Sequence, residues 1–190
     1  MAITNDDALA KRMALFRNHG ISSIPSDMQV RPADEIWNYQ QIELGFNYRM
    51  TELQAALGLS QLKKLDEFVQ TRHSIASKYD QVLQVLPVKR PWQHPDAYSS
   101  YHLYPIQVES SKCGKTQKEV YQALTQAGIK VNLHYIPVYR QPHFERLGFK
   151  TGYCPHAEHY FKSSISIPVY ASMRAEQQSR VVEEIRKSVV

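Results

Sequence analysis

Hydrophobic residues repeat every three or four positions in several parts of the chain, which is the spacing of one face of a helix. This pattern predicts helices over residues 6–19, from 51 toward 85 in one or two segments, and over 116–126, 156–162 and 174–189. The helix from 51 has a local start signal, because Thr51 and Gln54 have the spacing of a capping box. Its apolar steps predict one buried face, formed by Ala55, Leu59, Leu62, Leu65 and Val69.

The pattern changes after Pro87 and Pro91, where helical spacing gives way to alternation. Strands are predicted over residues 100–108, 130–138 and 164–168. The two prolines are therefore the best domain boundary in the chain. Residues 21–44 lack periodicity and contain two further prolines, so they are predicted to be a long loop with at most short elements.

The composition excludes only a few classes of function. The 190 residues are 43% hydrophobic and 22% charged, as in soluble globular proteins, and no apolar run approaches the length of a membrane span. We therefore expect a cytoplasmic protein that does not enter the membrane. The net charge of +5 suits an acidic small molecule or a nucleic acid, but the 23 Lys and Arg residues are scattered, which disfavours nucleic acid. His156 and His159 share a helix face without a third ligand, so no metal site is predicted.

Two polar residues, Asn47 and Arg49, stand directly ahead of the helix that begins near Thr51. Groups that bind an anion are often found at such a helix start. The equally weighted alternative is a polar loop whose arginine pairs with a surface carboxylate.

Several fragments now occur in order along the chain. They are Thr4-Asn5-Asp6, Phe16-Arg17-Asn18-His19-Gly20, Gly45-Phe46-Asn47-Tyr48-Arg49-Met50-Thr51-Glu52, Gln61-Leu62-Lys63-Lys64-Leu65, His102-Leu103-Tyr104-Pro105-Ile106, His134-Tyr135-Ile136-Pro137-Val138-Tyr139 and Ser166-Ile167-Pro168-Val169-Tyr170. Together they resemble the C-terminal half of the DegT/DnrJ/StrS sugar aminotransferases. The two histidine-led fragments are most similar to the transaminases of the pseudaminic acid pathway, which act on a UDP-linked 4-keto-6-deoxy N-acetylhexosamine.

The resemblance implies an α/β fold, specifically the C-terminal part of a fold type I aminotransferase. Residues 1–50 would be a remnant of the large cofactor-binding domain and its loop. Residues 51–86 would form a long interdomain helix. Residues 87–190 would form a small α+β domain, with a three- to four-stranded, mainly antiparallel sheet covered by helices.

The resemblance also implies that the intact enzyme uses pyridoxal phosphate to aminate a nucleotide-linked 4-keto sugar, in amino-sugar biosynthesis for a surface polysaccharide or glycan. In this family the Schiff-base lysine and the carboxylate beside the pyridine nitrogen precede a segment like Thr4-Asn5-Asp6. We therefore expect a fragment with no catalytic residue of its own, inactive alone and without bound cofactor.

Residue by residue, Asn47 matches the family asparagine that reaches the cofactor phosphate of the partner subunit. Arg49 matches the family arginine beside it, which could hold that phosphate or the diphosphate of the sugar. His134, Tyr135 and Tyr139 match positions that contact the nucleotide sugar, although many relatives have His in place of Tyr139. For Tyr135 and Tyr139, amphipathic strand residues with solvated hydroxyls are an equal alternative. We expect a homo-oligomer. The other functions that stay open are a non-catalytic binding or dimerisation module and, less favoured, a basic nucleic-acid-binding domain.

Overall fold

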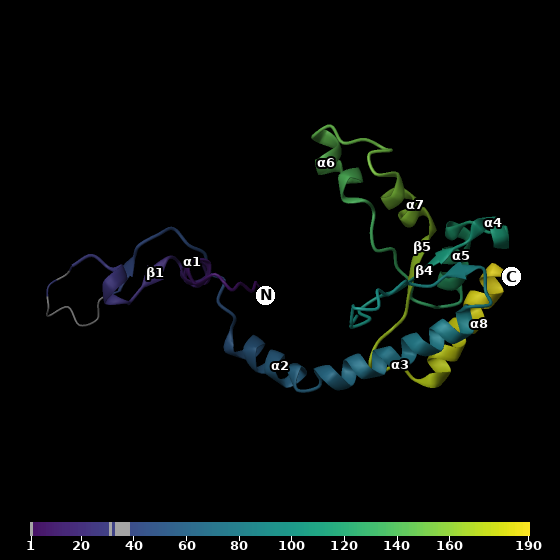
Figure 1. The fold of residues 1–190 in the computed structure, drawn as a ribbon, viewed down its shortest axis with the longest axis horizontal. Helices are drawn as coiled ribbons and strands as arrows, with labels where there is room; N and C mark the ends of the chain where they lie inside the picture. Colours follow the sequence, from purple (N-terminus) through teal and green to yellow (C-terminus); the bar gives the residue numbers. More distant parts are fainter. Residues whose placement is uncertain (1, 31, 33–38) are drawn as a thin grey trace. The chain divides into compact units, whose positions relative to one another are not determined.

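The computed structural model describes residues 2–30, 32 and 39–190. The chain divides into two compact units, Met1–Leu62 and Lys63–Val190, and Figure 1 shows their elements in sequence colours.

The first unit begins with helix α1, Asp7–Arg17, as the periodicity predicted. Asp6 caps this helix by accepting a hydrogen bond from the Leu9 amide at 3.0 Å. Strands β1, Ile21–Ser22, and β2, Gln40–Gln41, form a short antiparallel pair, and Pro25–Asp27 form the 3₁₀ turn η1. The predicted loop over 21–44 therefore has only short elements in its described part, while residues 31 and 33–38 of that loop lie outside the described residues.

Helix α2, Glu52–Leu62, ends the first unit and starts as the sequence predicts. The capping box is present: the Thr51 amide donates to Gln54 Oε1 at 3.0 Å, and the Gln54 amide donates to Thr51 Oγ1 at 3.3 Å. The prediction that this helix has a buried face is wrong for the described chain, because no α2 residue is buried and Leu59 and Leu62 are 64% and 62% exposed. Periodicity identifies an apolar face, but no described segment covers this one.

The second unit has an antiparallel sheet of three strands in the order β3 (Val88–Lys89), β4 (Tyr104–Val108) and β5 (Ser164–Ile167). Its helices are α3 (Leu65–Leu83), α4 (Ser110–Cys113), α5 (Gln117–Gln126), α6 (Pro142–Arg146), α7 (Pro155–Ser163) and α8 (Ala175–Val189), with a 3₁₀ turn η2 at Val138–Arg140. The predicted α+β fold, a small antiparallel sheet covered by helices, is confirmed. No helix among the described residues is both long and apolar enough to cross a bilayer.

Helices α3, α5 and α8 bury their apolar faces in one core with the sheet. Its fully buried members include Tyr79, Leu83, Tyr104, Ile106, Leu124, Ile165 and Ile185. Helix α3 supplies Tyr79 and Leu83 to this core, and the two compact units divide between Leu62 and Lys63. The domain boundary near Pro87 stays a prediction. The predicted helix over 51–86 is correspondingly two helices, separated by the turn at Lys63 and Lys64.

The strand predicted over 130–138 is largely absent. Only Asn132 forms a β-bridge, with Ser166 of β5, and the 3₁₀ turn begins at Val138. One local cause is visible: Pro137 has no amide to donate to a sheet. Alternation of polar and apolar residues was therefore not enough to specify a strand here.

Candidate functional site

The segment that carries Asn47 and Arg49 is fixed by its backbone to the end of α1. The Tyr48 amide donates to the Arg17 carbonyl at 3.0 Å, and Asn47 forms an isolated β-bridge with Asn18. The segment therefore approaches α2 from a defined position within the first unit.

Two glycines make this close pairing possible. A Cβ atom on Gly45 would overlap the backbone nitrogen of Gly20, and a Cβ atom on Gly20 would overlap the carbonyl oxygen of Glu43. Gly20 also has φ +69°, in the left-handed region that favours glycine. The two chain segments can approach this closely only because neither carries a side chain at the contact.

Asn47 and Arg49 are both exposed at this position, next to the capped start of α2. No ion pair of Arg49 occurs among the described residues, and the alternative interpretation stays a prediction. An amide and a guanidinium both offer N–H donors, and a guanidinium matches phosphate oxygens in a bidentate manner. The donor chemistry of this pair therefore fits a phosphate group.

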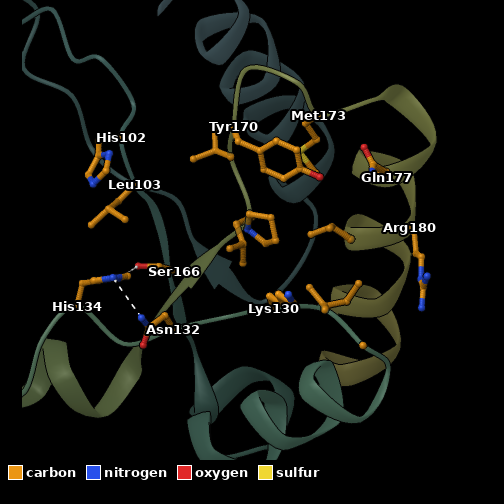
Figure 2. A pocket seen from close by; sticks show the side chains of 16 residues that line it. His102, Leu103, Lys130, Asn132, His134, Ser166, Tyr170, Met173, Gln177 and Arg180 are labelled. Atoms are coloured by element: carbon orange, nitrogen blue, oxygen red, sulfur yellow. Dashed lines mark hydrogen bonds between the residues drawn. The ribbon is translucent and has the colours of Figure 1, made fainter. Parts of the chain in front are cut away.

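The second unit contains a separate cavity of about 620 Å³, shown in Figure 2. Its lining is apolar in the middle and polar toward His134 and Asn132. His134 Nδ1 lies 2.8 Å from Ser166 Oγ, and His134 Nε2 lies 3.5 Å from Asn132 Nδ2. These contacts fix the imidazole plane at one end of the cavity.

Other polar groups of this cavity were missed by the sequence reasoning. His102 is exposed and lines the cavity. Lys130 and Arg180 also line it, and the Arg180 guanidinium donates to the Ala127 carbonyl at 2.8 Å, which satisfies the end of α5. No local sequence signal placed these residues together, because they come from distant segments of the second unit.

Tyr135 lies beside His134 but points mostly into solvent. Its side chain is 71% exposed, and the two rings meet edge to face with their centroids 4.7 Å apart. His134 and Tyr135 thus form a contiguous pair that presents an imidazole edge and a phenol.

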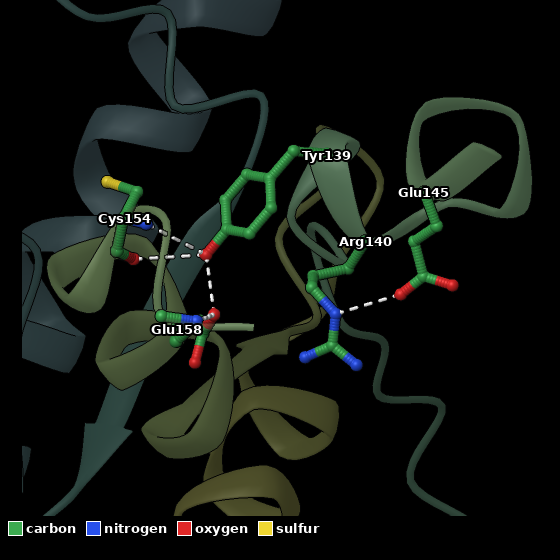
Figure 3. A network of polar contacts seen from close by, with 6 residues as sticks. Tyr139, Arg140, Glu145, Cys154 and Glu158 are labelled. Atoms are coloured by element: carbon green, nitrogen blue, oxygen red, sulfur yellow. Dashed lines mark hydrogen bonds and ion pairs between the residues drawn. The ribbon is translucent and has the colours of Figure 1, made fainter. Parts of the chain in front are cut away.

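Tyr139 lies apart from this pair, in the hydrogen-bond network of Figure 3. Its hydroxyl donates to Glu158 Oε1 at 2.7 Å and accepts a hydrogen bond from the Cys154 amide at 3.3 Å. The Gly152 amide donates to the same carboxylate oxygen at 2.6 Å. The Tyr139 hydroxyl is therefore hydrogen-bonded within the protein, and its predicted substrate contact stays a prediction.

The network shifts the acidity of both partners. The hydrogen bond from the Gly152 amide, followed by that from the Tyr139 hydroxyl, lowers the pKa of Glu158. Burial, followed by the hydrogen bond to Glu158, raises the pKa of Tyr139. Both shifts favour an ionised carboxylate that accepts from a neutral phenol. In the described part of the chain, no group of three or more His, Cys, Asp or Glu side chains could hold a metal ion.

Comparison with known proteins identifies the class. The model of the DegT/DnrJ/EryC1/StrS aminotransferase family matches residues 1–186, so the chain belongs to this family. Its structural neighbours are fold type I aminotransferases. The predicted membership is confirmed.

Individual members of the family are similar to the chain over nearly its whole length. The chain is 34% identical over 192 residues to the spore coat polysaccharide biosynthesis protein SpsC of Bacillus subtilis, covering 100% of the chain and 49% of SpsC. It is 32% identical over 188 residues to the UDP-4-amino-4,6-dideoxy-N-acetyl-beta-L-altrosamine transaminase of Helicobacter pylori, covering 98% of the chain and 47% of that enzyme. The solved structure of Helicobacter pylori PseC, an aminotransferase involved in pseudoaminic acid biosynthesis, matches with a TM-score of 0.82 at 31% identity, over 98% of the chain and 47% of PseC. The chain therefore spans about half the length of the curated relatives it matches.

Proposed function

We propose that the chain forms the C-terminal part of a pyridoxal-phosphate-dependent aminotransferase that aminates a nucleotide-linked 4-keto sugar. The observation that carries this proposal is the family match over residues 1–186, which includes both candidate sites. The similarity to a UDP-linked amino-sugar transaminase supports a UDP-linked N-acetylhexosamine as the substrate class.

The cofactor assignment rests on the first unit. Aminotransferases of this family use pyridoxal phosphate. When bound, this cofactor supplies the electron sink for moving an amino group between two carbon atoms. Asn47 and Arg49 would donate N–H groups to its phosphate, because both side chains are exposed on a segment whose backbone is pinned to α1. Their part in the chemistry is binding and orientation.

The substrate assignment rests on the second unit. His134 would bind a polar group of the nucleotide sugar with its ring edge, because Ser166 already fixes the imidazole orientation. Tyr135 would offer its ring face and hydroxyl, since both are largely exposed.

A titration with UDP-N-acetylglucosamine, a stable UDP-linked N-acetylhexosamine, tests this assignment. We expect NMR shift changes centred on His134 and Tyr135, and we expect His134→Ala to weaken binding. His143→Ala is the matched control, because His143 is an exposed histidine of α6 outside the cavity. Absence of binding, or equal weakening by both variants, would count against the proposal.

A second candidate function, a non-catalytic binding or dimerisation module, is supported by one specific observation. Four leucines of α2 are more than half exposed: Leu53 at 84%, Leu57 at 64%, Leu59 at 64% and Leu62 at 62%. Exposed apolar residues grouped on one short helix are typical of an association surface. This property is compatible with the first proposal, because a homo-oligomer would use the same helix.

A further inference from the structure

One short segment of the second unit is anchored at its start to the sheet. We name residues 133–138 the strap. Just before it, Asn132 exchanges two backbone hydrogen bonds with Ser166 of β5, at 3.2 and 2.8 Å. Within it, His134 bonds the Ser166 hydroxyl at 2.8 Å. One residue of β5 therefore holds both the backbone and a side chain at the start of the strap.

The end of the strap is anchored to a different element. Tyr139 follows the strap directly and donates to Glu158 of α7 at 2.7 Å. Glu158 is only 8% exposed and also accepts the Gly152 amide at 2.6 Å. The Tyr139 hydroxyl in turn accepts from the Cys154 amide at 3.3 Å. Figure 3 shows these groups converging on the phenol oxygen and the carboxylate.

Between the two anchors the strap turns its large side chains outward. Tyr135 is 71%, Ile136 46% and Val138 61% exposed. A segment fixed at both ends loses little further conformational entropy when a ligand binds to its exposed side chains. The anchors thus provide a preorganised surface from residues that take little part in the core.

We propose that Tyr139 and Glu158 form a latch that positions the strap, and through it Tyr135, for the nucleotide sugar. Both are positioning residues: the Tyr139 hydroxyl acts through Glu158 and need not touch the ligand. This inference rests on the proposed function, which places the nucleotide sugar against His134 and Tyr135. It assigns a role to a nearly buried carboxylate that the proposed chemistry does not use.

Four substitutions, one of them a control, test whether Tyr139 and Glu158 act as a latch. Tyr139→Phe removes the hydroxyl and keeps the ring, and Glu158→Ala removes the acceptor. Glu158→Gln keeps one acceptor oxygen and should restore part of the effect. Glu145→Gln is the control, because it weakens the ion pair of Glu145 in α6 with Arg140 in η2, 3.1 Å long, and Glu145 makes no hydrogen bond to Tyr139 or Glu158.

Two readouts on the full chain test the proposal. Hydrogen exchange of the Arg140 and Gln141 amides, which donate to the Pro137 and Val138 carbonyls at the end of the strap at 2.8 and 3.0 Å, should accelerate about tenfold or more in Tyr139→Phe and in Glu158→Ala, the effect of losing a hydrogen bond to a charged group. Exchange of β4 and β5 should stay unchanged, which shows that the fold is intact. Affinity for UDP-N-acetylglucosamine should fall roughly tenfold in the same two variants, less in Glu158→Gln, and within twofold of wild type in the control.

The outcomes separate this inference from the function on which it rests. A wild-type chain that does not bind the probe at the strap contradicts the proposed function and the latch together. If the wild type binds and the strap loosens without loss of affinity, the positioning role is wrong while the proposed function stands. If exchange of the Arg140 and Gln141 amides does not change in either variant, Tyr139 and Glu158 are no latch.

Discussion

The division of the chain between Leu62 and Lys63 can be tested by comparing two leucines on neighbouring helices. Leu83 of α3 is fully buried, whereas Leu57 of α2 is 64% exposed. The same substitution, Leu→Ala, should therefore destabilise the core of the second unit strongly at position 83 and hardly at all at position 57.

The expected cost follows from burial. Leu83→Ala removes three carbon groups, worth about 0.8 kcal/mol each in transfer free energy, or about 2.4 kcal/mol. The cavity left in a packed core raises the cost to about 3 kcal/mol or more. Leu57→Ala removes mostly solvated surface and keeps a strong helix former, so its cost should stay below about 0.5 kcal/mol.

Native-state hydrogen exchange at the amides of β4 and β5 measures this cost, because those amides exchange only when the core opens. A loss of 3 kcal/mol accelerates exchange roughly 150-fold. We expect that acceleration in Leu83→Ala and nearly wild-type exchange in Leu57→Ala. Equal acceleration by both substitutions would refute the conclusion that α3 belongs to this core and that α2 does not.

Three further predictions concern the first unit, the latch and association. Gly45→Ala should release the Asn47 segment from α1 and speed hydrogen exchange of that segment, because the new methyl group would overlap the backbone of Gly20. The control Gly58→Ala, which has open space around it, should leave this exchange unchanged. Equal exchange in the two variants would contradict this prediction. Because the pKa of Glu158 is lowered in the fold, the stability it contributes is present above pH 4.5 and is lost as the pH falls through its lowered value. The protection of the Gly152 and Cys154 amides, measured as exchange relative to the intrinsic rate at each pH, should therefore fall on acidification below pH 4.5 in the wild type and change less in Glu158→Gln. Light scattering at micromolar concentration should give a mass above 22 kDa that Leu57→Glu lowers, and a constant 22 kDa mass on dilution would contradict a homo-oligomer.

Local signals in the sequence predicted the local structure well. The capping box at Thr51 and Gln54 forms as predicted, because its hydrogen bonds join residues only three positions apart. The amphipathic helix over 174–189 is present as α8, with Val181 and Ile185 in the core, since its 3.6-residue period is independent of its neighbours.

Features that depend on distant partners were not predictable in this way. The apolar period of α2 identified a face at Leu59 and Leu62 but not what would cover it. The contact of Tyr139 with Glu158 spans 19 residues and depends on how α7 meets the preceding loop. Likewise, the cavity beside His134 gathers side chains from separate segments, which no single motif contains.

The close approach of Gly20 and Gly45 has an evolutionary consequence. Each glycine leaves space that the other segment occupies, so a larger residue at either position requires a compensating shift of the backbone at the other. A single nucleotide change that gives Gly20 or Gly45 a side chain would be removed by selection before a second change could compensate. The two positions should therefore be inherited as a pair, and lineages that have lost one glycine should also have remodelled the turn that carries the other.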